Sequence, residues 1–280
     1  MILAAASAAF TRDLDFDLAR ARSLISDAQE RRADLLVMPH GVLGGYLDDL
    51  DPGPAAADPP PALDLRHPAV LALLEAAGDM TVCFGFTERL GDDGRANVAV
   101  CGTAAGVLGV QRKVHLPPGE VPWYQAGEDL AAFDTPVGRL GMLIDYDKTF
   151  PEAARALALD GAQVLAFVCA WPLSRTQPAS KVAHDRQSVL FDLYDRARAA
   201  ENQVVVVTAN LSGTQGRLRF LAQAKVVLPD GAVVARTGFR PGVVGAEVDV
   251  AAVVDTARAT QHHLAERRPS AYGPPRAGRR

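Results

Sequence analysis

The stretch that decides the fold is Gly141-Met142-Leu143-Ile144-Asp145-Tyr146-Asp147-Lys148-Thr149-Phe150-Pro151-Glu152. Its apolar start is typical of a buried strand, and Pro151 with Glu152 is typical of the first turn of a helix. A strand that turns this sharply into a helix pushes the side chain at the bend into the open, near the positive end of the helix dipole. We therefore expect the side chain of Asp145 to face an open site.

Short apolar runs alternate with helical patterns on both sides of this stretch. The patterns predict strands over residues 2–9, 34–39, 80–87, 96–102, 106–112, 139–146, 162–169, 203–210, 220–228, 232–236 and 243–249. They predict helices over residues 13–31, 68–78, 151–160, 185–201 and 251–266. Strand–helix–strand units at both ends of the chain indicate a layered α/β fold. The run Val204–Val207 is apolar without alternation, which suits a strand that is buried on both faces.

The composition excludes several classes of protein. Lys and Arg number 29 and Asp and Glu number 33, a net charge of −4, so a nucleic-acid partner is not expected. The longest apolar runs have about ten residues, too few to cross a membrane. The apolar start has no preceding Lys or Arg, so we read it as a strand of a cytoplasmic protein rather than a signal peptide. Three unpaired cysteines, Cys83, Cys101 and Cys169, argue against a disulfide framework or a zinc knuckle.

The chain shows no interdomain linker, so a single domain is predicted over residues 1–266. The tail over residues 267–280 holds five Arg with Pro and Gly, and we expect it to be flexible or to dock on a partner subunit. Residues 51–61 carry five prolines and form a loop too long for a tight turn, which favours a flexible excursion or a flap near a site.

Two further strand ends carry polar residues. Leu35–Met38 runs into Pro39 and His40, and the strand that ends at Arg112 is followed by Lys113 and, farther on, by Glu120. Ligand sites of α/β proteins gather at the carboxyl ends of their strands. Together with the bend at residue 145, these positions predict one site.

These motifs resemble those of the nitrilase superfamily, the carbon–nitrogen hydrolases. The family has a strand followed by Pro-Glu, then Arg-Lys-x-His-Leu with a downstream Glu, then a Cys-x-Asp-x-x-x-Pro-Glu bend. The matching stretches here are 35–40, 112–120, 145–152, 159–162, 170–172, 196–202 and 229–231. The resemblance implies a four-layer αββα sandwich, a homodimer or larger homo-oligomer, a small-molecule substrate and no cofactor.

Two positions depart from the family pattern. The family nucleophile is the Cys at the bend and the family base is the Glu after the Pro; this chain has Asp145 and His40 there. Lys113 matches the lysine that stabilises the oxyanion, and Glu120 matches the second Glu, which orients that lysine. Carboxylates attack amides and nitriles poorly, so the thioester route is not expected. His40, Lys113 and Asp145 instead form a candidate acid–base set for a carbonyl, amide or imine substrate, with His40 expected to titrate near its ordinary pKa of about 6.5.

Other interpretations of the site remain open. The chain fits an inactive homologue that binds a ligand, or an amide or nitrile hydrolase with an unusual nucleophile, such as a relocated Cys169. A metal bound by His40, Glu120 and Asp145 has acceptable ligand types, but Lys113 would repel the ion, so no metal is predicted. Tyr46, Cys169 and Trp171 are the candidates for contact with the substrate.

Overall fold

The computed structural model describes residues 1–51 and 59–272. Six parallel strands form the centre of the sheet, in the order β3-β2-β1-β9-β8-β7. These strands are β1 (Ile2–Ala8), β2 (Leu35–Val37), β3 (Thr81–Leu90), β7 (Gly138–Ile144), β8 (Val164–Cys169) and β9 (Val205–Leu211). Antiparallel strands extend them: β4 (Gly94–Thr103), β5 (Gly106–Arg112), β6 (Phe133–Thr135), β12 (Lys225–Val227), β13 (Val233–Arg236) and β14 (Gly242–Glu247).

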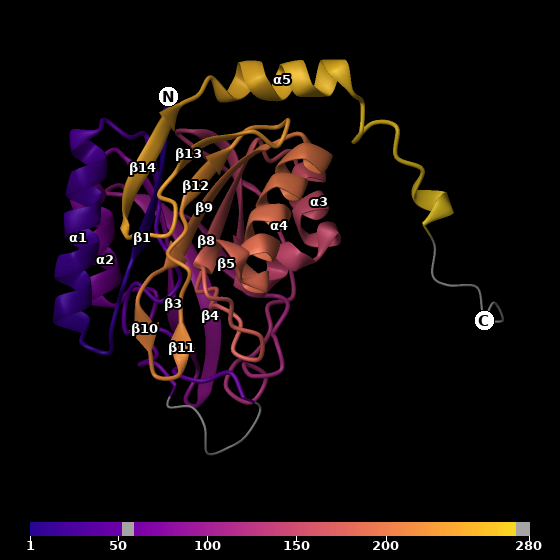
Figure 1. Cartoon of the computed structure of the whole chain (residues 1–280). Helices are drawn as coiled ribbons and strands as arrows, with labels where there is room; N and C mark the ends of the chain where they lie inside the picture. Colours follow the sequence, from indigo (N-terminus) through magenta and orange to yellow (C-terminus); the bar gives the residue numbers. More distant parts are fainter. Residues whose placement is uncertain (52–58, 273–280) are drawn as a thin grey trace.

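The sheet consists of two halves that meet along a short seam. β1 pairs with β2 and β14 along most of its length, but with β9 only through Ser7–Asn210 and Ala8–Leu211. The halves are therefore free to lie face to face, as the sandwich in Figure 1 shows. The apolar residues between them come from both halves, for example Leu35 and Val37 from one and Met142 and Val168 from the other.

The described part of the chain forms five α-helices. They are α1 (Leu14–Glu30), α2 (Pro68–Ala77), α3 (Pro151–Leu159), α4 (Arg186–Asn202) and α5 (Val250–Thr260). The side chains of Asp13, Asp185 and Asp249 cap α1, α4 and α5 by accepting main-chain N–H groups of the first turn. In Figure 1, α1 and α2 lie on one outer face of the sandwich and α3 and α4 lie on the other.

Three separate apolar clusters define the layers. One packs α1 and α2 against the first half of the sheet, one lies between the halves, and one packs α3 and α4 against the second half. Three cores between four layers are what an αββα sandwich requires. The predicted fold class is therefore confirmed.

Several predicted boundaries were wrong. The helix expected over residues 251–266 ends at Thr260, and the strand expected over 220–228 is reduced to Lys225–Val227 because Ala222 has a φ of +56°. The strand expected over 139–146 ends at Ile144, before a 3-10 helix, η1 (Asp145–Thr149). Strand β6 and the hairpin β10 (Thr214–Gln215)–β11 (Leu218–Arg219) were not predicted.

Residues 52–58 of the expected flap and residues 273–280 of the expected tail lie outside the described residues. Within the described residues, no helix is both long enough and apolar enough to cross a membrane.

Candidate active site

The bend after β7 places Asp145 at the carboxyl edge of the sheet. Asp145 has a φ of +45°, in the left-handed region that residues other than glycine seldom adopt. Its Oδ2 lies 3.4 Å from the Nζ of Lys113, and its Oδ1 accepts the main-chain N–H of Ala170, which follows β8. The bend thus brings the side chain of Asp145 together with groups that follow two other strands, Lys113 after β5 and Ala170 after β8.

Asp147 joins the segment that carries Lys113 to the bend. Its Oδ1 accepts the main-chain N–H of His115 at 2.8 Å and lies 2.9 Å from the Nδ1 of the same histidine. The main-chain N–H of Val114 also donates to Asp147, at 3.2 Å. One aspartate two residues after Asp145 thus fixes the chain immediately after Lys113. This explains how the lysine that follows β5 reaches the carboxylate that follows β7.

Lys113, Glu120 and Tyr46 form a buried chain of contacts. The Nζ of Lys113 lies 2.8 Å from the Oε1 of Glu120, and the hydroxyl of Tyr46 donates to the same oxygen. All three side chains are buried. Burial alone would lower the pKa of Lys113, but Glu120 and Asp145 outweigh it and the pKa lies above its usual value. Burial raises the pKa of Glu120, an effect that Lys113 opposes. The lysine is therefore held as a cation between two carboxyl groups.

His40 lies under this set rather than inside the cavity. Its side chain is fully buried, its ring meets that of Tyr46 edge-on at 5.8 Å, and neither ring nitrogen has a hydrogen-bond partner within the described residues. Burial lowers the pKa of His40 to about 4; Lys113 acts in the same direction, whereas Asp145 opposes it. The expectation of a pKa near 6.5 was wrong, because burial of the ring in the interior disfavours its charged form.

The buried His40 makes the stability of the fold depend on pH. Its pKa is about 4 in the folded state and 6.5 in its ordinary state, so the unfolded chain binds more protons between these values. The contribution of His40 to the free energy of unfolding is therefore fully present above pH 6.5 and is lost as the pH falls toward 4. We expect wild type to lose about 3 kcal/mol more unfolding free energy than His40→Gln over this range. Urea unfolding at several pH values measures the difference; parallel curves for the two proteins would contradict it.

Gly85 on β3 provides the space for the His40 ring. A Cβ at this position would lie 2.6 Å from Cδ2 of His40 and 2.9 Å from Cγ1 of Val168. We expect Gly85→Ala to lower the free energy of unfolding by about 1–3 kcal/mol through overpacking. The double variant with His40→Ala should recover part of the loss, because the clashing ring is gone. Strictly additive losses in denaturant unfolding would show that the ring is not the obstacle.

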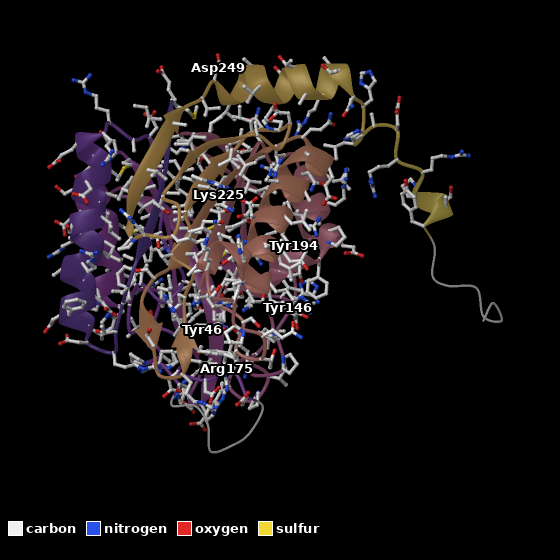
Figure 2. The ribbon with its side chains drawn as sticks, viewed as in Figure 1. Tyr46, Tyr146, Arg175, Tyr194, Lys225 and Asp249 are labelled. Atoms are coloured by element: carbon white, nitrogen blue, oxygen red, sulfur yellow. The ribbon has the colours of Figure 1, made fainter. Side chains whose placement is uncertain are left out.

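A cavity of about 790 Å³ opens over Lys113 and Asp145. Its wall also includes Tyr46, Tyr146 and Trp171. Figure 2 shows Tyr46, Tyr146 and Arg175 toward the same end of the sandwich, away from Asp249. His40 and Glu120 are not among the lining residues, so they act on a bound molecule only through Tyr46, Lys113 or Asp145.

Of the two other residues expected to contact the substrate, Trp171 and Cys169, only the first lines the cavity. Trp171 lines the cavity, and its indole Nε1 donates to the Oε1 of Gln187 at 3.0 Å. Cys169 is fully buried and does not line the cavity. Burial also raises the pKa of its thiol well above the usual value, which keeps it protonated. Cys169 is therefore not part of the proposed site.

The cavity has features that the sequence interpretation missed. At the rim of the cavity, Asp49 and Asp51 form ion pairs with two arginines. Arg175 pairs with both aspartates and lies 2.8 Å from Asp51, and Arg217 lies 2.8 Å from Asp49. These pairs join residues more than a hundred positions apart, so no local pattern announces them. Asn210 holds Trp171 through both main-chain atoms. Asn210 could have been found, because it is a polar residue near the end of the apolar strand β9.

Comparison with known proteins places this geometry in a family. A model described as "Carbon-nitrogen hydrolase" matches residues 3–258. The chain belongs to the carbon–nitrogen hydrolase family. A Pseudomonas protegens protein named "Hydrolase in pqqF 5'region" is 32% identical over 264 residues, which cover 93% of this chain and 86% of the relative. Human omega-amidase NIT2 is 32% identical over 163 residues, covering 54% of this chain and 55% of that enzyme.

Solved structures of this family share the fold. A carbon–nitrogen hydrolase from Helicobacter pylori superposes with a TM-score of 0.84 at 20% identity, covering 97% of this chain and 96% of its own. An amidase from Nesterenkonia, in a form with acrylamide added to its active-site cysteine, superposes with a TM-score of 0.76 at 23% identity, covering 97% and 98%. At these identities the likeness shows the fold alone.

Proposed function

We propose that this protein is a small-molecule enzyme of the carbon–nitrogen hydrolase family that performs acid–base chemistry on a carbonyl, amide or imine substrate without a thioester. The observation that carries the proposal is the carboxylate of Asp145, 3.4 Å from the ammonium of Lys113, in the wall of the cavity. On this interpretation Asp145 and His40 take the positions of the family's nucleophilic Cys and first Glu.

The geometry supports a division of roles. Asp145 reaches the cavity and can accept or return a proton of a bound substrate. Lys113 is cationic beside it and can stabilise an oxyanion or enolate as charge develops. Glu120 touches Lys113 but not the cavity, so it orients the ammonium. His40 is buried, and its ring is neutral above pH 4. It therefore contributes to the packing and polarity around Tyr46 rather than to proton transfer near neutral pH.

A thiol route has little support within this chain. The three cysteines, Cys83, Cys101 and Cys169, are all fully buried, and none lines the cavity. An open cavity with Lys113 and Asp145 in its wall also favours an enzyme over a binding protein whose site has collapsed. The family match favours a hydrolase, so release of ammonia is measured along with other products.

The test is a screen of small amides, nitriles, imines and keto acids followed by mass spectrometry and an ammonia assay. We expect turnover that persists after iodoacetamide treatment and in Cys169→Ala, and that Lys113→Ala abolishes. Inhibition by iodoacetamide together with an acyl adduct on a cysteine would overturn the proposal. Tight binding of a compound with no conversion by wild type would instead identify a binding protein.

A further inference from the structure

A second cluster of charged side chains lies in the interior, outside the cavity. Lys148, Asp195 and Lys225 are all fully buried, and none lines the cavity. The Nζ of Lys148 lies 2.7 Å from Oδ1 of Asp195, and the Nζ of Lys225 lies 3.1 Å from Oδ2 of the same residue. Figure 2 shows Lys225 apart from Tyr46 and Arg175. Buried ion pairs contribute little net stability compared with apolar residues of similar size, so the cluster calls for another explanation.

The two lysines come from different places. Lys225 belongs to β12, whereas Lys148 belongs to η1, three residues after Asp145. The side chain of Lys148 therefore connects the bend that carries Asp145 to α4. Its Nζ also lies 3.1 Å from the ring centroid of Phe191 on α4 and 5.2 Å from that of Trp171 in the cavity wall.

The bend needs such a connection because Asp145 has a strained backbone. A left-handed φ at a residue other than glycine costs about 1–3 kcal/mol and persists only where the surroundings impose it. Arg198 of α4 donates to the main-chain oxygen of Lys148 at 2.9 Å and to that of Thr149 at 3.1 Å. The ion pair between the side chains of Lys148 and Asp195 is a third contact between η1 and α4, in addition to these two hydrogen bonds to main-chain oxygens.

We propose that Lys148 is a positioning residue: through Asp195 it anchors the bend to α4 and holds the side chain of residue 145 against Lys113. Lys225 shares Asp195 but does not touch the bend, so it contributes to stability alone. The inference rests on the proposed function only for the importance of Asp145, and its test needs no turnover.

The test uses a thiol as a reporter of position 145. In Asp145→Cys the new thiol stands beside Lys113, which should lower its pKa and speed its alkylation by iodoacetamide at neutral pH. The natural cysteines are buried, so wild type gives the background rate. Adding Lys148→Met should move the thiol away from Lys113 and raise its pKa by about one unit, which slows alkylation at pH 7 about tenfold.

Lys225→Met in the same reporter protein is the matched control. It removes a buried lysine from the same aspartate, while Lys225's other partner, Asp192, keeps its contact with Arg236. We expect a comparable loss of unfolding free energy for the two lysine variants, but an alkylation pH profile for Lys225→Met within about twofold of the reporter protein. Equal changes in the profile for both variants would overturn the proposal, because the cluster would then act only through general stability.

Asp195→Asn separates anchoring from a direct effect of charge. Loss of the anchor predicts a higher thiol pKa at position 145, whereas removal of a nearby negative charge alone predicts a lower one. If Lys148→Met fails to fold, Asp195→Asn still tests the proposal. A raised pKa in Asp195→Asn supports the proposal, and an unchanged or lowered pKa contradicts it. Neither result depends on whether a substrate is found, so a failure here and a failure of the substrate screen are distinct.

Discussion

Replacement of Lys113 by Met is expected to destabilise the fold by about 3–5 kcal/mol and to abolish turnover. Lys113 is buried and is the cation in contact with both Glu120 and Asp145. Its removal leaves two carboxyl groups close together without a compensating charge, which is the costly way to break a buried ion pair. Denaturant unfolding measures the loss of stability, and the activity screen measures the loss of turnover.

Two variants show whether the lost charge is the cause. Lys181→Met makes the same substitution at an exposed position and should leave stability unchanged within about 0.5 kcal/mol. The double variant of Lys113→Met with Glu120→Gln should be more stable than Lys113→Met alone, since one of the two stranded charges is gone. If the double variant is less stable by the full sum of the single effects, the three groups do not form a unit.

Asp145→Asn is expected to lower turnover by about 10²–10⁴-fold while the fold is retained. The amide keeps the size of the side chain but cannot take up a proton, which removes the contribution of a general acid or base. Lys113 retains Glu120 as a partner at 2.8 Å, so the buried ammonium is not left without a counter-charge. Steady-state kinetics on the substrate found in the screen give kcat, and circular dichroism confirms the fold.

Asp51→Asn provides the comparison for this effect. Asp51 also lines the cavity, but it pairs with Arg175 at the rim and is half exposed. We expect its replacement to change turnover by less than about tenfold, since surface ion pairs contribute little. Equal losses in the two variants would mean that the cavity needs its total negative charge rather than a proton acceptor at position 145.

The place of Lys113 and Asp145 in the candidate site could be predicted from the sequence because both residues follow predicted strands. Polar residues at strand ends favour a site there, and the residues after β5 and β7 do meet even though 32 positions separate them. The state of His40 could not be predicted in the same way. It also follows a strand, but its burial depends on its packing against Tyr46, six residues later in the chain, and against Gly85 of β3, and neither contact leaves a local pattern in the sequence.

The same distinction applies to the elements of the fold, which could be predicted only where they leave a local pattern in the sequence. Long periodic helices such as α1 and buried strands such as β8 were predicted within one or two residues, because burial on one or both faces leaves a pattern in the residues themselves. The two-residue strands of β10–β11 leave no such pattern. Strand β12 was overestimated because residues 220–224 bend at Ala222, so that pairing with β9 begins only at Lys225.

The seam between β1 and β9 has a consequence for the cavity. Asn210 is one of the two residues of β9 that join the halves of the sheet, and it is also the residue that grips the main chain of Trp171. The junction of the two half-sheets and the support of the aromatic cavity wall therefore meet in one residue: the main chain of Asn210 pairs across the junction, and its side chain holds Trp171. Replacement of Asn210 is therefore expected to disturb the junction of the half-sheets and the position of Trp171 together.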